Sequence, residues 1–180
     1  PWEEHTAPDK MHMITPVEMN MWADQLIPVF YDECRKGIAS NRAPGPDELQ
    51  GELLKHMPNE MHELIKKAFL RFWREGKTPN TWKVSHTWML HKKGDPTKLK
   101  NWRPITLTNV IYKMWTNVVA RMMSEYAEQV GIFTDAQEGF RREKNTVRQL
   151  LRLMGALEDS LLAEKEIHVM YIDFQNAFGS

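Results

Sequence analysis

Apolar side chains return every three or four residues over the first regular stretch of the chain. Thr15 is predicted to cap a helix there, with Glu18 completing a capping box, and the apolar pattern continues to about Lys36. Gly37 is predicted to end this helix. Pro28 should kink or split it, because proline lacks the N–H that a helix interior needs. The residues before Thr15 show no period and are expected to form an arm.

Two later stretches carry wider apolar stripes at the same spacing. The first begins at Asn59 and ends at Gly76, and the second begins at Asn109 and ends at Gly131. Such stripes are the buried faces of helices. The apolar positions of the first are Met61, Leu64, Ile65, Ala68, Phe69 and Phe72. Those of the second are Val110, Ile111, Met114, Trp115, Val118, Val119, Met122 and Tyr126.

Capping residues predict two further helices. Asp47 follows a loop rich in proline and glycine, and it is expected to cap a short helix that runs to about Met57. Thr146 and Gln149 form a second capping box, which should open a helix that continues to about Ala163.

Strand patterns are fewer. Residues 83–91 alternate well enough for a strand, and Ile105–Leu107 is a second short candidate. Gly94-Asp95-Pro96, between them, should form a turn or loop. The run Ile167–Phe174 is almost continuously apolar, which predicts a strand buried on both faces. A buried strand needs neighbours, and too few other candidates are present to surround it. The chain is therefore expected to be an α+β or α/β structure and the front part of a larger domain.

Composition agrees with a globular chain. Hydrophobic residues make up 42% of the 180 residues and charged residues 27%, which is ordinary for globular proteins. No stretch approaches the roughly 18 apolar residues that a membrane span needs, so no membrane partner is expected. The lone cysteine, Cys34, excludes an internal disulfide and fits a reducing, intracellular compartment. Its thiol is expected to be a small buried apolar group.

The net charge is zero, but the charges are unevenly distributed. Residues 1–82 carry 10 basic and 13 acidic side chains, a net of −3. Residues 83–152 carry 13 basic and 6 acidic side chains, a net of +7, and residues 153–180 carry 1 basic and 5 acidic, a net of −4. The central block is either a surface for a polyanion such as nucleic acid or an ordinary solvated face, and charge alone does not separate the two.

Asp173 stands near the end of the predicted buried strand. A carboxylate there is costly to bury unless it meets a cation, and the carboxyl ends of strands are where α/β enzymes place their chemistry. The alternative is a strand-end aspartate that caps the following turn through Asn176. Phe178 lies five residues on, close enough to lie over the same pocket after a turn. An acidic site beside a basic surface is the arrangement that metal-dependent phosphoryl transfer needs.

Two loops carry basic and aromatic residues. In the first, five basic side chains fall within twelve residues between the two early strand candidates: Lys92, Lys93, Lys98, Lys100 and Arg103. A hairpin with such a tip can lean over a phosphate chain, or it is simply a solvated loop. The second loop is Gln137–Arg142, in which Gly139 lets the backbone approach a ligand and Phe140 offers a stacking face. The alternative for this loop is ordinary packing.

Four blocks, in order, resemble the reverse transcriptases of non-LTR (LINE-type) retrotransposons over residues 42–180. Ala43-Pro44-Gly45-Pro46-Asp47 with Glu52-Leu53-Leu54-Lys55 is similar to the extra N-terminal motif of that family. Residues 78–96, Asn101-Trp102-Arg103-Pro104-Ile105 and Asn109–Lys113 are similar to its first fingers motif, and Gln137-Glu138-Gly139-Phe140-Arg141 to its second. Residues 171–178, Tyr-Ile-Asp-Phe-Gln-Asn-Ala-Phe, are similar to motif A of the palm.

The resemblance implies an architecture. It predicts an α+β fold of mostly helical fingers with a short β-hairpin, leading into the first strand of a polymerase palm. It divides the sequence into an N-terminal arm and helix (1–40), a fingers region (41–166) and the start of the palm (167–180). The remaining palm and the thumb of the same polyprotein are the partner segments that the family implies.

The resemblance also implies roles for single residues. Asp173 matches the catalytic aspartate that binds Mg²⁺, with the carbonyl of Phe174 as a further ligand, and Phe178 matches the aromatic under the incoming sugar. Arg103 matches a residue on the nucleotide triphosphate, joined by a lysine among Lys92, Lys93 and Lys98. The residues expected near template or nucleotide are Gln137, Gly139, Phe140 and Arg141.

The implied function is RNA-directed DNA polymerisation with an RNA template, a DNA primer, a dNTP and Mg²⁺, and the life cycle of the family implies a nuclear location. Gly179 departs from the aspartate that the family commonly has there. The Asp-Asp pair that completes the metal site is absent from the sequence, so the 180 residues alone are expected not to polymerise. The alternative is a non-catalytic, nucleic-acid-binding remnant of a reverse transcriptase.

Overall fold

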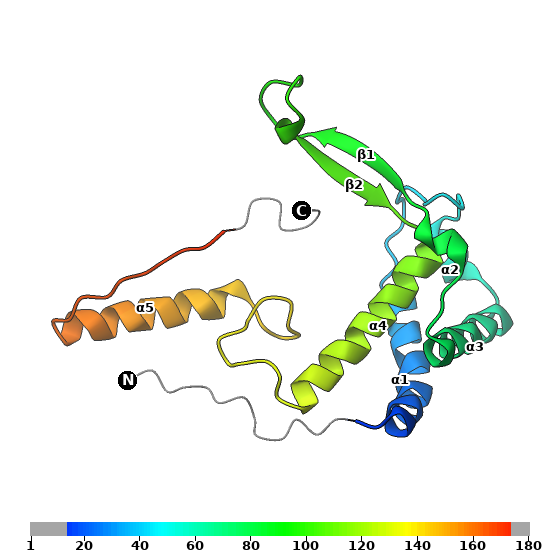
Figure 1. Ribbon diagram of the computed structural model, residues 1–180, viewed down its shortest axis with the longest axis horizontal. Helices are drawn as coiled ribbons and strands as arrows, with labels where there is room; N and C mark the ends of the chain where they lie inside the picture. The colour runs from blue at the N-terminus through cyan, green and yellow to red at the C-terminus, as the bar shows by residue number, and fades with distance from the viewer. Residues whose placement is uncertain (1–13, 174–180) are drawn as a thin grey trace. The chain divides into compact units, whose positions relative to one another are not determined.

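The computed structural model of the chain describes residues 14–173, and Figure 1 shows its helices and strands. The chain forms two compact units, with the boundary between Ile132 and Phe133. This boundary reflects packing within each unit, whereas the divisions at residues 40 and 166 follow the family motifs and stay predictions.

Within residues 14–132 the first unit is built on four α-helices, of which α1 packs against α4, α3 and α2 (Figure 1). Their bounds are α1 Pro16–Lys36, α2 Gly51–His56, α3 Asn59–Glu75 and α4 Val110–Gln129. All four regions were predicted as helical, because their capping residues and apolar periods are local signals.

Helix α1 begins and ends as predicted. The Oγ1 of Thr15 accepts a hydrogen bond from the backbone N–H of Glu18 at 3.3 Å, and the Glu18 carboxylate accepts one from the N–H of Thr15 at 2.8 Å. Gly37 is the C-cap. Pro28 does not split the helix, which is continuous to Lys36, so a split at this residue is excluded and the predicted kink stays a prediction. Pro28 cannot donate a helical hydrogen bond, but burial of Ile27 and Phe30 on either side of it stabilises the helix without that bond.

The core of this unit is an aromatic cluster between α1, α3 and α4. The rings of Phe69 and Trp115 lie 5.1 Å apart edge to face, and those of Tyr31 and Phe69 lie 5.6 Å apart in the same arrangement. Cys34 is buried as predicted, and burial raises the pKa of its thiol. The predicted stripe of α4 is therefore a core face, with Met114, Val118 and Met122 buried.

The predicted buried face of α3 is only partly correct. Phe69 is fully buried, but Met61 is 43% exposed and Leu64 is 58% exposed. His62 takes the buried place instead, and it is 2% exposed. The reason is a partner on α1, since the hydroxyl of Tyr31 lies 2.8 Å from Nδ1 of His62. A histidine that is hydrogen-bonded in this way tolerates burial, which the apolar pattern of α3 did not reveal.

The Tyr31–His62 pair predicts a loss of stability in acid. Burial raises the pKa of Tyr31 to about 12, so its hydroxyl stays protonated while it is hydrogen-bonded to Nδ1 of His62. Burial also lowers the pKa of His62 below its ordinary value of 6.5. Below pH 6.5 the unfolded chain binds a proton at His62 more readily than the folded chain does. The stability that neutral His62 provides is therefore present above pH 6.5 and is lost as the pH falls below that value.

Urea unfolding at several pH values between 7.5 and 5 measures this effect. The His62→Gln variant should lose less free energy of unfolding over that range than the unaltered chain does. The exposed His86, changed to glutamine, is the matched control and should leave the pH dependence unchanged. Equal pH dependence in the His62→Gln variant and the unaltered chain would contradict the assignment.

A two-stranded antiparallel hairpin leaves the helical body of the first unit (Figure 1). Strand β1, His86–His91, pairs with β2, Trp102–Leu107, in a register that places His86 opposite Leu107 and His91 opposite Trp102. Short 3₁₀ helices precede the two strands, η1 at Asn80–Lys83 and η2 at Leu99–Asn101. The first strand begins three residues later than predicted because η1 takes up Lys83.

The loop Pro44-Gly45-Pro46 lies against the root of the hairpin. A Cβ added to Gly45 would stand 2.5 Å from the carbonyl carbon of Thr108 and 2.6 Å from the backbone nitrogen of Asn109. These two residues join β2 to α4, so only a glycine lets the two backbones meet this closely. The predicted cap at Asp47 is wrong, because α2 begins at Gly51 and the Asp47 carboxylate instead accepts from the N–H of Leu49 at 3.3 Å.

The second unit contains α5, Thr146–Leu162. The helix is where the sequence predicts it, but its N-cap is one residue earlier. Oδ1 of Asn145 accepts a hydrogen bond from the N–H of Arg148 at 3.1 Å, so the capping box predicted for Thr146 is wrong. Both residues are favourable caps, and the extended backbone of Asn145 decides between them.

The strand predicted at Ile167–Phe174 is not formed over the part that the structure describes. Residues 167–173 have no regular secondary structure, and their apolar side chains are exposed, from 41% for Ile167 to 83% for Met170. Phe174 lies outside the described residues. A strand needs backbone partners, and the two strands found within residues 14–173 pair with each other.

The fold class is α+β, as predicted, with helices outweighing a single two-stranded sheet in the described residues. None of the helices within residues 14–173 is both long enough and apolar enough to cross a membrane.

Candidate nucleic-acid interface

The tip of the hairpin is closed by its own backbone and side chains. The N–H of Lys92 donates to the carbonyl of Asn101 at 2.8 Å, which extends the strand pairing by one step. Gly94 turns the chain at a φ of 86°, and Nε2 of His91 lies 3.1 Å from its carbonyl oxygen. The indole N–H of Trp102 donates to the carbonyl of Pro96 at 2.8 Å. The predicted turn is therefore an ordered loop.

The acidic residue of the tip, Asp95, is occupied within the loop. Its carboxylate accepts hydrogen bonds from the N–H of Thr97 at 3.0 Å and from the Thr97 hydroxyl at 2.7 Å. The backbone hydrogen bond from Thr97 lowers the pKa of Asp95, so the carboxylate stays charged. Nζ of Lys98 lies 3.9 Å from Oδ2 of Asp95, so the carboxylate partly neutralises the charge of this lysine.

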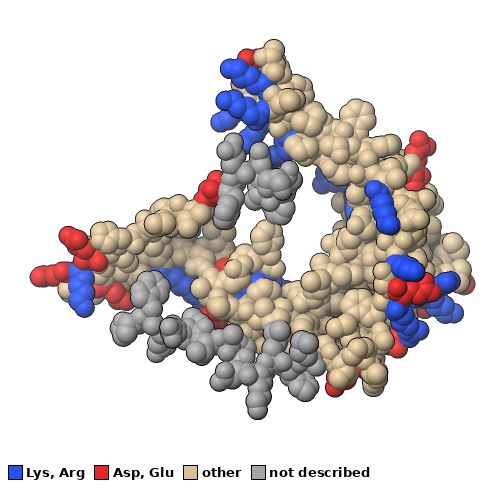
Figure 2. All heavy atoms as spheres, viewed as in Figure 1, with Lys and Arg blue, Asp and Glu red and all other residues tan. Residues whose placement is uncertain are grey.

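The other lysines of the tip are left to solvent. Lys92, Lys93 and Lys100 are exposed, and none of them makes an ion pair with another described residue. Figure 2 shows the basic side chains gathered at the end of the hairpin. Like charges held this close repel one another, and a polyanion lowers that repulsion. The loop geometry thus presents a concentrated positive surface.

Arg103 lies on one face of the hairpin, next to the tip. It stands opposite Leu90 in the register, and directly paired residues point to the same face. That face also carries Trp88, which is 67% exposed, and Ile105, which is 41% exposed. Arg103 is exposed and makes no ion pair within residues 14–173. The structure therefore brings Arg103 and the candidate lysines together on one hairpin.

The loop that contains Gln137–Arg141 belongs to the second unit, and its polar groups bind one another. The guanidinium of Arg141 donates to the carbonyls of Thr134 at 2.8 Å and Gln137 at 3.0 Å, and it lies 5.0 Å from the centre of the Phe133 ring. The side-chain amide of Gln137 donates to the carbonyl of Gly139 at 2.9 Å. These contacts give both side chains a role in shaping the loop.

Gly139 is not enforced by crowding, whereas Phe140 has an unusual backbone conformation. A Cβ on Gly139 would meet its nearest atom, Nε2 of Gln137, at an ordinary 3.7 Å, so crowding does not explain the glycine. Phe140 is 96% exposed and has a φ of 62°, an uncommon backbone conformation for a bulky residue. An exposed aromatic ring on a strained backbone is a signal of function rather than of packing.

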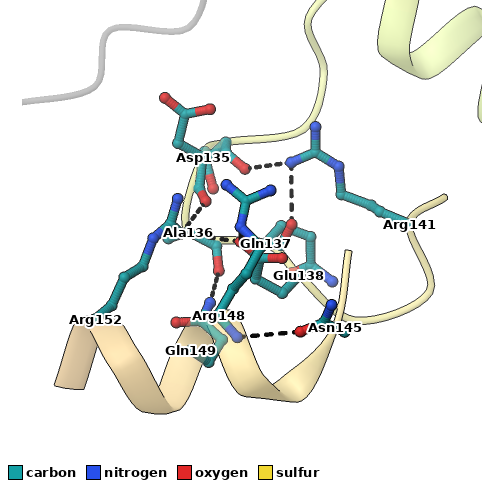
Figure 3. Close-up of polar contacts among 10 residues, drawn as sticks. Asp135, Ala136, Gln137, Glu138, Arg141, Asn145, Arg148, Gln149 and Arg152 are labelled. Atoms are coloured by element: carbon teal, nitrogen blue, oxygen red, sulfur yellow. Dashed lines mark hydrogen bonds and ion pairs between the residues drawn. The ribbon is translucent and has the colours of Figure 1, made fainter. Parts of the chain in front are cut away.

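Sequence reasoning missed the residues that attach this loop to α5. Figure 3 shows Glu138 facing Arg148 and Arg152, whose guanidinium nitrogens lie 3.5 Å and 3.2 Å from its Oε1. Gln149 and Arg152 also donate to the backbone carbonyls of Ala136 and Asp135. The sequence did contain a signal for this contact. Arg148 and Arg152 are one helical turn apart, so they share a face of the helix that could bind the glutamate of the preceding loop.

The motif A residues lie at the end of the described chain. Asp173 is exposed, while Phe174 and Phe178 lie outside the described residues. A carboxylate oxygen is the ligand type that Mg²⁺ prefers. However, residues 14–173 contain no group of three or more His, Cys, Asp or Glu side chains placed to hold a metal. The described residues therefore do not form a Mg²⁺ site by themselves.

Comparison with known proteins supplies relatives over most of the chain. It is 27% identical over 168 residues to the "Probable RNA-directed DNA polymerase from transposon BS" of Drosophila melanogaster, which covers 91% of this chain and 18% of that protein. It is 29% identical over 141 residues to the "Probable RNA-directed DNA polymerase from transposon X-element" of the same species, covering 78% of this chain and 16% of that protein.

A third relative is the "RNA-directed DNA polymerase from mobile element jockey" of Drosophila funebris, 24% identical over 180 residues, which covers 98% of this chain and 19% of that protein. No protein-family model matches the chain. The chain spans less than a fifth of the length of these three relatives. The resemblance that the four motif blocks indicated is confirmed by these proteins.

Proposed function

We propose that this chain, which is related to the RNA-directed DNA polymerases of non-LTR retrotransposons, holds nucleic acid and nucleotide as the fingers and palm start of such a polymerase. The observation that carries the proposal is the hairpin tip, a loop with four lysines beside Arg103, whose single acid is bound within the loop itself. The relatives named as polymerases supply the class of reaction.

The tip fits a phosphate chain by simple electrostatics. Lysines that contact phosphates release condensed counterions, which favours binding and makes it dependent on salt. A lysine is a compact point charge that suits this contact in any orientation, whereas the planar guanidinium of Arg103 suits two oxygens of one phosphate. We assign the lysines to the phosphate backbone or triphosphate, and Arg103 to the triphosphate of an incoming nucleotide.

Phe140 is the second contact that we assign to nucleic acid. Its ring is 96% exposed, and an unpaired base gains stability by stacking on such a ring. Gln137, Gly139 and Arg141 belong to the same loop, and their contacts with one another support a role in shaping this surface. RNA template and DNA primer are the partners that the proposal implies.

Asp173 is proposed as one carboxylate of the catalytic site of the complete polymerase, with Phe178 beside the sugar of the nucleotide. A chimera tests this assignment: the 180 residues replace the matching part of the transposon BS relative. Primer extension by that chimera should be lost on Asp173→Asn and retained on Asp159→Asn, which removes an exposed charge from α5. Full extension by the Asp173→Asn chimera would remove Asp173 from the site.

Binding by the chain itself tests the function directly. Affinity for a single-stranded RNA of about 20 nucleotides, measured by fluorescence anisotropy, should fall steeply as salt is raised from about 50 mM to 200 mM. A flat salt dependence, or no binding at the lower salt, would contradict the proposal that this chain holds a phosphate backbone.

A further inference from the structure

The loop of the second unit contains a buried charge, the carboxylate of Glu138. The side chain of Glu138 is 4% exposed, and the guanidinium groups of Arg148 and Arg152 lie 3.5 Å and 3.2 Å from its Oε1. Both of its oxygens are buried, and neither has a hydrogen-bond partner among the described residues, so the two ion pairs at Oε1 are its polar contacts there. A carboxylate is kept out of water only where cations compensate its lost hydration, so the two arginines are what make this position tolerable.

The same face of α5 holds the loop at its neighbouring residues. Arg152 donates to the carbonyl of Asp135, and Gln149 donates to the carbonyl of Ala136 (Figure 3). With Glu138, three loop residues within four positions are bound to side chains of one helix. Helix side chains one turn apart share a face, so these contacts fix the path of the loop as it leads into α5.

Phe140 comes two residues after Glu138, so the orientation of its ring depends on the path of the loop. Its φ of 62° costs free energy, and such a conformation persists only where the surroundings impose it. Because the ring is 96% exposed, its own packing supplies almost nothing that could hold it. The constraint must come from the backbone on either side. Arg141 on one side is bound to the carbonyls of Thr134 and Gln137, and Glu138 on the other side is the anchor whose side chain is buried.

We propose that Glu138, clamped by Arg148 and Arg152, is a positioning residue that holds Phe140 outward as a stacking surface for an unpaired nucleic-acid base. This rests on the proposed function, because it assumes that the loop meets nucleic acid. In this proposal, stacking of bases takes place on the second unit, and contacts with phosphates are made by the lysines of the hairpin.

The clamp has a second consequence, which separates positioning from mere stability. In the Glu138→Gln variant, Arg148 and Arg152 lose the carboxylate that balances their charge, although Arg152 keeps its hydrogen bond to the carbonyl of Asp135. Contacts with phosphate should then strengthen, and the salt dependence of binding should steepen, since each added cation–phosphate contact releases a counterion. At the same time Phe140 is no longer held outward, so the preference for a ligand with bases should fall. A loss of folded protein would lower both together.

The test compares two single-stranded oligonucleotides of equal length and charge, one with bases and one in which every position is abasic. Anisotropy gives the ratio of their affinities for the unaltered chain, for Glu138→Gln, for Phe140→Ala and for the double variant. Glu143→Gln is the matched control, because it removes the same charge from an exposed residue of the same segment.

We expect the unaltered chain and Glu143→Gln to prefer the base-bearing strand by roughly tenfold. Glu138→Gln and Phe140→Ala should each bring the ratio close to one, and the double variant should lower it no further, because one residue acts through the other. Phe140 is exposed, so its replacement gives a result even if Glu138→Gln fails to fold.

Three results would overturn the inference. The first is an unchanged ratio in Glu138→Gln. The second is a ratio of one in the unaltered chain while salt-dependent binding persists, which rejects the stacking role and leaves the proposed function in place. The third is an absence of binding to either strand at low salt, which rejects both.

Discussion

Replacing Lys92, Lys93, Lys98 and Lys100 together with glutamine is expected to weaken the binding of single-stranded RNA by roughly 100-fold at about 0.1 M salt. The four side chains stand on a loop of ten residues whose only acid is bound to Thr97, so the surface owes its charge to them. Each lost phosphate contact on a single strand lowers the salt slope by about 0.7. Four contacts account for a change in slope of about 3.

The fold should survive this change, because none of the four lysines is buried and the backbone contacts that close the loop remain. Circular dichroism and thermal unfolding check that point. The matched control removes four exposed lysines from elsewhere, Lys36, Lys67, Lys77 and Lys165, which gives the same net charge. If the control weakened binding as much as the tip variant, net charge rather than the hairpin would explain the affinity.

Gly45→Ala is expected to lower the free energy of unfolding by about 1–3 kcal/mol, since a new Cβ would overlap the backbone of the hairpin root. The added atom would stand 2.5 Å from the carbonyl carbon of Thr108 and 2.6 Å from the nitrogen of Asn109. Both are backbone atoms, so no side-chain rotation relieves the overlap. Either the loop or the junction of β2 and α4 must shift.

Urea titration measures this loss, and a second glycine supplies the control. Gly155 lies within α5, and a Cβ there would meet nothing within 4 Å. Gly155→Ala should therefore raise stability by about 0.5–1 kcal/mol, because glycine weakens a helix interior. A stable Gly45→Ala variant would contradict the close packing of the Pro-Gly-Pro loop. Because that packing supports the hairpin, the variant should also bind RNA less tightly.

The sequence predicted the elements whose signals are local. The capping box of Thr15 and Glu18 involves residues three apart, and the stripe of α4 repeats within a single helix. Gly76 and Gly131 end their helices at positive φ, as a glycine after an apolar pattern indicates. The basic hairpin tip was also visible, because its lysines lie within one short loop.

The predictions that failed depended on distant partners. His62 looks polar along α3 and is buried only because Tyr31, 31 residues earlier, offers a hydroxyl. Residues 167–173 look like a buried strand, yet a strand forms only where another backbone supplies hydrogen bonds. Glu138 was not predicted as a structural residue, because its burial depends on two arginines of the following helix. The motif A roles of Asp173 and Phe178 rest on the family resemblance and stay predictions.

The most direct test of the central claim is to map where nucleic acid meets the chain. Backbone amide chemical shifts, recorded while a short RNA–DNA template–primer is added, report each residue that the ligand touches. The largest changes should fall on residues 92–103, with a second set around Phe140 and little change on the outer face of α3. Shifts confined to the helical body, with the hairpin unaffected, would contradict the proposal that this hairpin holds the nucleic acid.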